Sequence, residues 1–278
     1  MAKRRLDSLL AERGLFSSRS RAAASIMAGE VLLGDGERPA SKPGELVRED
    51  ERLRVRARRA FVSRGGEKLA NALDSSGLDV CGRRALDVGA STGGFSDCLL
   101  RRGAREVIAV DVGYGLLAWS LREDDRVHVL ERTNARALTP ALLPYAPDLA
   151  VVDVSFISLR KVLGVVLSCM APGADVLALV KPQFELGRGR IGKGGVVRDA
   201  DARREALVAV GESALELGAE VVSYHSSGLA GPKGNRETFI RLAQPRPAAT
   251  AAVALGPGGL AGGGGAEDLE RLAREVEP

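Results

Sequence analysis

Two lysines and two carboxylates stand at points in the sequence where a folded chain can bring them together. Asp153 follows the apolar run LAVV, and Lys181 follows the run VLALV. Such near-continuous apolar runs are typical of strands buried on both faces, and the carboxyl ends of such strands are where open α/β sheets bind ligands. Lys68 in SRGGEKL and Glu237 in GNRETF are further residues of these types, which taken alone most often lie at a protein surface. Because a lysine rarely enters a core without a partner, we expect Asp153 and Lys181 to be neighbours at the carboxyl edge of the sheet.

The chemistry open to this set is removal of a proton from a weak nucleophile, with Lys181 as the candidate general base. A free lysine has a pKa near 10.4 and is mostly protonated at pH 7, so a catalytic lysine needs a value of roughly 7 to 8. Burial and the positive charge of Lys68 favour the neutral amine, whereas Asp153 and Glu237 favour the ammonium. We expect the carboxylates to hold the lysines and to limit their desolvation cost, and the sequence leaves open which influence is stronger.

A glycine-rich loop precedes most of these residues and follows another strand pattern. In LDVGASTGGF, three glycines permit a tight turn and a close approach of the backbone to a ligand. Ser91 stands where the dinucleotide fingerprint GxGxxG has its second glycine, so the loop departs from that pattern. Asp111 ends the next strand pattern, at about the offset from Asp87 at which an acidic residue binds ribose hydroxyls in nucleotide-binding α/β folds.

This loop resembles motif I of the class I methyltransferases, and its glycine spacing favours S-adenosylmethionine over NAD as the cofactor. The resemblance implies that Asp87 and the loop backbone hold the methionine part, and Asp111 has the residue type that binds a ribose. Asn134, beyond the third strand, is a candidate for the adenine end. The candidate cofactor-binding residues are Asp87, Gly89, Ala90, Ser91, Thr92, Gly93, Gly94, Phe95, Asp111 and Asn134.

The order Lys, Asp, Lys, Glu along the chain resembles the K-D-K-E tetrad of the FtsJ-like ribose 2′-O-methyltransferases. The resemblance places the catalytic tetrad on Lys68, Asp153, Lys181 and Glu237. A ribose 2′-hydroxyl is a poor nucleophile that must lose its proton as it attacks the sulfonium methyl group, which is a task for Lys181. The remaining contribution is positioning, because hydroxyl oxygen, methyl carbon and sulfur must be in line.

The elements that position these residues follow a repeating strand–helix pattern. Four apolar runs, RRALDVG, AREVIAVDVG, PDLAVVDVSF and ADVLALVKP, alternate with helical patterns, which indicates a parallel, doubly wound sheet. DARREALVAVGESALELG reads as an amphipathic helix, and AEVVSYHSS and RETFIRLAQ read as two closing strands. The turn-rich GLAGPKGN between them is compatible with an antiparallel hairpin. The predicted fold class is α/β, with a Rossmann-like class I methyltransferase sheet and a small amino-terminal α+β domain.

The amino-terminal region is basic and has a different pattern. Residues 1–60 hold 14 Lys/Arg against 9 Asp/Glu, which suggests a polyanionic partner. RLDSLLAERGLFSSRSRA, followed by IMAGEVLLGDG, predicts two short helices and then short strands, and it resembles the S4 RNA-binding module. The resemblance implies contacts to RNA phosphates, which arginine forks suit. The candidate RNA-binding residues are Lys3, Arg4, Arg5, Arg19 and Arg21.

Several classes of site are disfavoured by composition. The three cysteines are scattered with no CxxC pair, and only two histidines are present, so neither a disulfide framework nor a metal site is expected. The amino terminus lacks an apolar signal region, and no apolar run reaches the roughly 18 residues of a membrane span. We therefore expect a cytoplasmic protein. Its oligomeric state is left open.

We expect four regions along the chain. An S4-like RNA-binding domain covers residues 1–56, a basic linker covers 57–63, and the methyltransferase domain covers 64–243. The Pro-, Ala- and Gly-rich region over 244–278 predicts a low-complexity, disordered tail, in which AEDLERLAREVE could form a terminal helix without chemistry.

The combination of an S4 module with these motifs resembles the TlyA family of ribosomal RNA methyltransferases, also known as haemolysin-like. The resemblance implies methylation of the 2′-hydroxyl of cytidine in 23S RNA and, because basic residues precede Leu6, in 16S RNA too. Ribosomal RNA or ribosomal subunits would be the partners. Three alternatives stay open: a non-catalytic RNA-binding or ribosome-assembly factor, a membrane-active haemolysin, and a pseudouridine synthase, since those enzymes also carry S4 modules.

Overall fold

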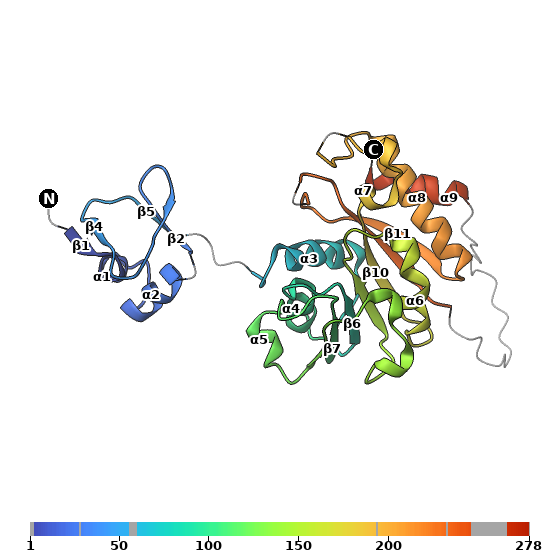
Figure 1. Cartoon of the computed structure of the whole chain (residues 1–278), viewed down its shortest axis with the longest axis horizontal. Coiled ribbons are helices and arrows are strands. Elements are labelled where there is room, and N and C mark those ends of the chain that lie inside the picture. The colour runs from blue at the N-terminus through green and yellow to red at the C-terminus, as the bar shows by residue number, and fades with distance from the viewer. Residues whose placement is uncertain are drawn as a thin grey trace. The chain divides into compact units, whose positions relative to one another are not determined.

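The computed structural model divides the chain into two compact units, residues 1–59 and 60–278. It describes residues 3–27, 29–55, 60–192, 194–231, 233–245 and 266–277 (Figure 1). Each unit has its own buried apolar core.

The amino-terminal unit has the predicted succession of two helices and short strands. β1 (Lys3–Arg5) leads into α1 (Leu6–Glu12), and α2 (Arg19–Met27) follows. The remaining strands are β2 (Val31–Leu33), β3 (Arg38–Pro39), β4 (Leu46–Arg48) and β5 (Leu53–Val55). β1 pairs with β4, and β3, β2 and β5 form a second small sheet. The Ser18 hydroxyl accepts a hydrogen bond from Arg21 N at 3.2 Å, so Ser18 caps the amino-terminal end of α2.

The second unit is built on a seven-stranded sheet of order β11-β12-β10-β9-β6-β7-β8. Its strands are β6 (Arg84–Val88), β7 (Glu106–Val110), β8 (Val127–Leu130), β9 (Leu149–Val152), β10 (Asp175–Val180), β11 (Glu220–Ser226) and β12 (Thr238–Ala243). The five strands from β8 to β10 are parallel, whereas β12 runs antiparallel to both β10 and β11. The prediction of a doubly wound α/β sheet closed by an antiparallel pair is confirmed.

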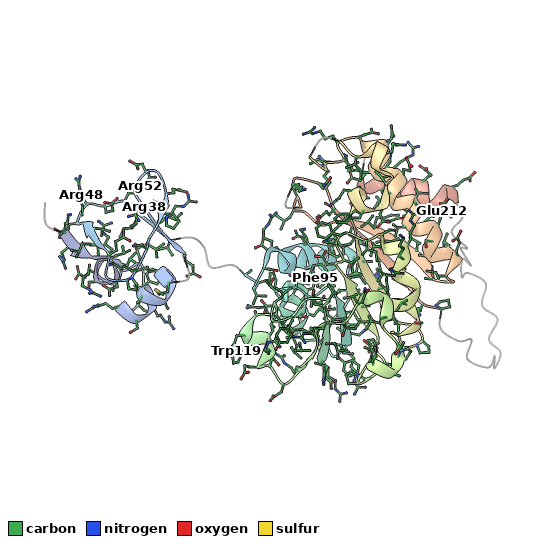
Figure 2. All side chains as sticks on the ribbon, in the orientation of Figure 1. Arg38, Arg48, Arg52, Phe95, Trp119 and Glu212 are labelled. Atoms are coloured by element: carbon green, nitrogen blue, oxygen red, sulfur yellow. The ribbon has the colours of Figure 1, made fainter. Side chains whose placement is uncertain are left out.

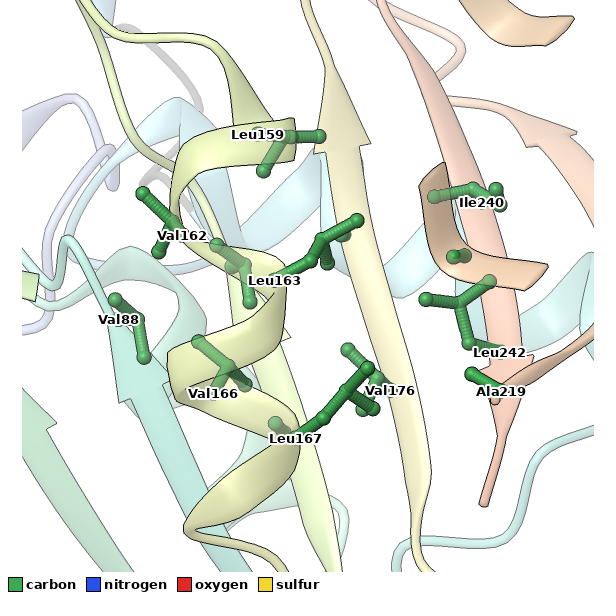
Figure 3. Close-up of a cluster of buried hydrophobic side chains, with 14 of the residues drawn as sticks. Val88, Leu159, Val162, Leu163, Val166, Leu167, Val176, Ala219, Ile240 and Leu242 are labelled. Atoms are coloured by element: carbon green, nitrogen blue, oxygen red, sulfur yellow. The ribbon is translucent and has the colours of Figure 1, made fainter. Parts of the chain in front are cut away.

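Helices cover both faces of this sheet, because successive strand residues point to opposite sides. α3 (Arg64–Ser76) and α4 (Gly94–Arg101) bury their apolar residues against one face. α6 (Leu163–Ser168) and α8 (Ala200–Glu216) cover the other face. Figure 3 shows α6 directing Leu163, Val166 and Leu167 toward the sheet. Two shorter helices, α5 (Trp119–Arg122) and α7 (Pro182–Glu185), lie near strand ends.

The structure refines two of the predicted regions. The end of the predicted linker is part of the second unit: Phe61 packs against the α3–α4 core, and Val62 N donates to Asp97 Oδ2 at 2.8 Å. The last part of the predicted tail forms the terminal helix that the sequence allowed: α9 (Ala266–Val276) packs on α8 and β11, with Leu269 and Ala273 fully buried. Residues 56–59 of the linker and 246–265 of the tail lie outside the described residues.

Candidate active site

The four residues of the predicted tetrad form two ion pairs. Lys68 Nζ donates to Glu237 Oε2, and both side chains are buried, at 9% and 1% exposure. Lys181 Nζ lies 2.5 Å from Asp153 Oδ1, with the lysine buried and the carboxylate partly exposed. The set therefore has no net formal charge when all four groups are ionised.

Lys68 lies on the second turn of α3. Ser63 is the amino-terminal cap of this helix, with its hydroxyl accepting from Gly65 N at 3.3 Å. Gly66 allows α3 to lie close to its surroundings, since a Cβ there would lie 2.4 Å from Phe61 Cβ and 2.8 Å from Gly94 O. From this closely packed helix the Lys68 side chain reaches Glu237.

Lys181 is placed by the end of β10. Pro182 begins α7 with its fixed φ, so the strand stops at Val180 and the helix starts directly after the lysine. Lys181 Nζ also donates to Ser155 Oγ at 2.9 Å. Ser155 lies two residues beyond Asp153, so one loop supplies both partners of the amine. This explains why a core strand can end in a charged residue.

Glu237 precedes β12 and is held by the loop before it. A Cβ at Gly231 would lie 2.3 Å from Glu237 Oε1, so only glycine lets the loop lie against the carboxylate. Gly231 N donates to Asn235 O at 2.8 Å, which closes that loop. The Glu237 side chain consequently has little freedom to leave Lys68.

One cavity of about 490 Å³ is lined by the whole tetrad. Its lining residues are Lys68, Gly89, Ser91, Asp153, Ser155, Phe156, Lys181, Gln183, Phe184, Ile191, Gly195, Gly231, Lys233, Asn235 and Glu237. We refer to it as the tetrad cavity.

A second cavity, of about 410 Å³, adjoins the first and is called the cofactor cavity here. It is lined by Gly89, Ser91, Val110, Asp111, Val112, Leu116, Thr133, Asn134, Ala135, Asp153, Val154, Ser155, Phe156 and Ile157. The two cavities share Gly89, Ser91, Asp153, Ser155 and Phe156. A ligand in one would therefore be next to a ligand in the other.

The donors and acceptors of the cofactor cavity fit S-adenosylmethionine. Asp111 accepts from Gly113 N at 2.7 Å and from Ser91 N at 2.8 Å, which fixes the carboxylate while each oxygen keeps a lone pair for a ribose hydroxyl. Asn134 Oδ1 accepts from Arg136 N, which orients the amide group so that its NH₂ can donate to an adenine acceptor. Val112, Leu116 and Ile157 give apolar surface for a base.

Six of the ten predicted cofactor residues do not line this cavity: Asp87, Ala90, Thr92, Gly93, Gly94 and Phe95. Asp87 is fully buried, and its Oδ2 accepts from Ser96 N at 2.9 Å and from Ser96 Oγ at 2.6 Å. Burial, with the nearby charges of Asp153 and Asp111, raises the pKa of Asp87 to about 7. Asp87 therefore anchors the start of α4 through Ser96, and its assignment to the methionine part of the cofactor stays a prediction.

The glycines at the start of α4 serve packing. A Cβ at Gly94 would lie 2.1 Å from Ser63 Oγ and 2.8 Å from Gly66 N, so this glycine lets α3 and α4 touch. A Cβ at Gly93 would meet Leu121 Cδ1 at 2.2 Å. Phe95, labelled in Figure 2, is buried in the core. Its ring lies 5.7 Å from that of Phe239. Of the predicted glycines, Gly89 alone lines a described cavity.

The sequence interpretation missed the loop after β9. Phe156 is 91% exposed and has a φ of 65°, a left-handed backbone that is uncommon for a bulky residue and marks local strain. Its ring lies 5.4 Å from the ring of Phe184 on α7. Both phenylalanines line the tetrad cavity. The sequence does contain a signal for these two phenylalanines, because each stands three residues after a candidate catalytic residue at a strand end: Phe156 after Asp153, and Phe184 after Lys181.

In the amino-terminal unit, a buried carboxylate organises two of the predicted RNA-binding arginines. Asp7 accepts from Arg5 at 2.8 Å and from Arg19 at 3.3 Å, while both arginines stay exposed. The Arg5 guanidinium, with help from Arg19, lowers the pKa of Asp7 to about 2. This arrangement holds two guanidinium groups side by side near the starts of α1 and α2.

The other basic residues of this unit divide into paired and unpaired ones. Arg4 pairs with Glu12 and Glu49. Lys3 and Arg21 are exposed, and neither side chain has an ion pair within the described part of the chain. Arg38, Arg48 and Arg52, labelled in Figure 2, pair with Glu45, Asp50 and Asp35 respectively.

Comparison with known families identifies both units. Residues 61–244 match the family of FtsJ-like methyltransferases, and residues 4–53 match the S4 domain. The chain is 52% identical to the 16S/23S rRNA (cytidine-2′-O)-methyltransferase TlyA of Mycobacterium tuberculosis, over 87% of this chain and 91% of that protein. It is 37% identical to Hemolysin A of Brachyspira hyodysenteriae, over 84% of this chain and 97% of that protein.

Solved structures agree with this assignment. A protein from Streptococcus thermophilus, described as a candidate hemolysin, has a TM-score of 0.69 and 35% identity, covering 99% of this chain and 96% of its own. An S-adenosylmethionine-dependent methyltransferase structure from Listeria monocytogenes has a TM-score of 0.50 at 13% identity, over 66% of this chain and 100% of its own, and shows the shared fold. The chain therefore belongs to the TlyA family of FtsJ-like methyltransferases, with an S4 domain at its amino terminus.

Proposed function

We propose that the protein transfers a methyl group from S-adenosylmethionine to the ribose 2′-hydroxyl of cytidine in ribosomal RNA. The observation that carries the proposal is the tetrad cavity: Lys68, Asp153, Lys181 and Glu237 come from four distant parts of the chain and line one space. That space adjoins a cavity that fits the methyl donor. The 2′-hydroxyl of a nucleotide in the tetrad cavity would meet the methyl group at the boundary formed by Asp153, Ser155 and Phe156.

In this proposal Lys181 is the general base. S-adenosylmethionine supplies a methyl group on a positively charged sulfur. Lys181 takes the hydroxyl proton as the oxygen–carbon bond forms and the carbon–sulfur bond breaks. Asp153 and Ser155 fix the direction of the amine, and they leave the product ammonium with a carboxylate and a hydroxyl as partners. Lys68 and Glu237 form the second ion pair of the tetrad cavity. The positive charge of Lys68 there disfavours the protonated form of Lys181.

Phe156 and Phe184 give the tetrad cavity an aromatic rim. An exposed ring held in a strained backbone is suited to stack on a base that has left its own stack, and base–aromatic stacking contributes about 1–3 kcal/mol. The S4 unit would bind the surrounding RNA through Arg5, Arg19 and Arg21. RNA recognition would thus combine phosphate contacts made by the S4 unit with stacking of the target base on the aromatic rim of the tetrad cavity.

We propose both 16S and 23S RNA as substrates, and ribosomal subunits in the cytoplasm as the partners. The support is the 52% identity, over nearly the full length, to a relative whose name includes both RNAs. The membrane-active alternative has only the name of one relative in its favour. Within the described residues no helix is both long and apolar enough to cross a bilayer.

The test is direct transfer of a labelled methyl group to ribosomal RNA, followed by mass spectrometry of the nucleosides. We expect 2′-O-methylcytidine with the wild-type protein and none with Lys181→Ala. Arg105→Ala is the matched control. It removes an exposed cation just before β7, at the amino-terminal end of a parallel strand and away from the tetrad, and it should keep full activity. Methyl transfer undiminished in Lys181→Ala would refute the assigned base. Cofactor binding without any transfer would favour the non-catalytic factor, and absent cofactor binding would favour a pseudouridine synthase.

A further inference from the structure

The carboxyl-terminal helix reaches the core of the second unit, and its last described residue carries a buried charge. Leu269 and Ala273 of α9 are buried, and a Cβ at Gly211 of α8 would lie 2.9 Å from Leu269 Cδ2. Glu277, directly after the helix, is only 4% exposed. A buried carboxylate is costly without partners, and Glu277 has several on neighbouring elements.

The main partner of Glu277 is Arg203 on α8, which is also buried. Arg203 Nε donates to Glu277 Oε2 at 2.9 Å, and Arg203 NH1 donates to Arg198 O at 2.7 Å. One guanidinium thus joins Glu277 to the segment before α8. Arg204 strengthens the same link by donating to Glu277 O at 2.8 Å.

The segment held by Arg203 is joined to the tetrad cavity by Asn235. Val197 N donates to Asn235 Oδ1, and Asn235 Nδ2 donates to Gly195 O, both at 2.8 Å. Gly195 and Asn235 line the tetrad cavity, and Asn235 lies two residues before Glu237. Arg236, between them, has its NH1 3.7 Å from Glu277 Oε2. The segment 195–198 and the segment 235–237 are therefore both linked to the Glu277 carboxylate, through Arg203 and Arg236 respectively.

We propose that Glu277 is a positioning residue for the catalytic tetrad. Through Arg203 it holds residues 195–198, and through Asn235 and Arg236 this segment keeps Glu237 against Lys68. The inference rests on the methyl transfer proposed above, because it assigns a part in that reaction to the carboxyl-terminal helix. It extends the active site to a region in which the sequence suggested no chemistry.

The test compares Glu277→Gln with two controls in the full-length protein. Glu275→Gln removes an exposed carboxylate from the same helix, and Arg83→Gln breaks ion pairs at the opposite edge of the sheet. We expect Glu277→Gln to lower kcat about tenfold or more, with unchanged KM for RNA and unchanged cofactor affinity, because a small displacement of a catalytic group has effects of this size. Arg203→Lys, which keeps the charge but loses the fork, should lower kcat in the same direction.

A second readout does not need the reaction. In Glu277→Gln, hydrogen exchange at the Val197 amide should become at least tenfold faster, while exchange at the Ser96 amide stays the same. Unchanged kcat together with unchanged Val197 exchange would overturn the inference. So would an equal fall of kcat in Arg83→Gln, since the effect would then follow general stability. If the wild-type protein transfers no methyl group, the proposed function fails, and the Val197 exchange still decides whether Glu277 holds the loop.

Discussion

The Lys68–Glu237 pair gives a prediction that separates stability from activity. Glu237→Gln keeps the shape of the side chain and leaves the Lys68 ammonium buried beside a neutral amide. Exposed ion pairs contribute about 0–1 kcal/mol, but removing one partner of a buried pair costs about 3–5 kcal/mol. With side-chain exposures of 9% and 1%, the buried case applies. The folding equilibrium constant should therefore fall by a factor of about 10² to 10⁴.

Removing both charges should have a different effect. A buried ion pair replaced by apolar residues of similar volume is often neutral or stabilising, because the desolvation cost of both ions disappears. The double variant Lys68→Met, Glu237→Met should thus unfold within about 1 kcal/mol of the wild-type protein, yet transfer no methyl groups. Such a result would mean that the Lys68–Glu237 ion pair serves the reaction and does not add to the stability of the fold.

The assay is urea unfolding combined with single-turnover methyl transfer. Glu275→Gln, which breaks an exposed pair with Arg271, is the control and should change stability by less than about 0.5 kcal/mol. A loss below about 1 kcal/mol in Glu237→Gln would show that water reaches the pair and would refute the burial argument. Full activity in the double variant would refute the catalytic assignment.

Three further predictions follow from single residues. The pKa of Asp87 is about 7 in the folded protein and 3.8 in the unfolded chain, so between these pH values the folded state binds one more proton than the unfolded state. The free energy of unfolding should therefore fall by up to about 4 kcal/mol as the pH rises from 4 to 7. Asp87→Asn should remove this fall, which Tm measurements at pH 5 and pH 8 would show. Phe156→Gly should change unfolding free energy by no more than about 1 kcal/mol, since the ring is exposed and its φ is positive, but should reduce methyl transfer to RNA at saturating cofactor. Arg21→Ala should weaken RNA binding and lower the slope of log affinity against log salt by about 1, with cofactor affinity unchanged in calorimetry; an equal loss of cofactor affinity would mean that Arg21 supports the fold.

The sheet and the tetrad could be predicted from the sequence for one physical reason. Parallel strands buried on both faces are long apolar runs, and a charge at the end of such a run has only the sheet edge to occupy. Asp153 and Lys181 follow strands that pair in the structure, β9 and β10, so their meeting follows from the topology. Lys68 and Glu237 have no such local signal, and only the resemblance to the FtsJ-like family placed them.

Other features depend on packing between distant segments, which no local pattern records. The glycines of the loop before α4 were assigned to cofactor approach, yet Gly93 and Gly94 are required by contacts to Leu121 and Ser63. The sequence after residue 265 predicts a helix, but its burial depends on Gly211 and Arg203 of α8, far away in the chain. The strained φ of Phe156 is likewise set by its loop and not by its residue type.

The carboxylates at this sheet edge also indicate which kind of ligand the cofactor cavity accepts. Asp87, Asp111 and Asp153 follow or end neighbouring parallel strands, and their mutual repulsion contributes to the raised pKa of Asp87. Asp153 has Lys181 as a partner, whereas Asp111 has no cation at ion-pair distance among the residues that the structure describes. A ligand with a positive charge lowers this repulsion on entering the cavity, and the pyrophosphate of a dinucleotide increases it. The electrostatics of the edge thus favour a sulfonium methyl donor over NAD, independently of the glycine spacing.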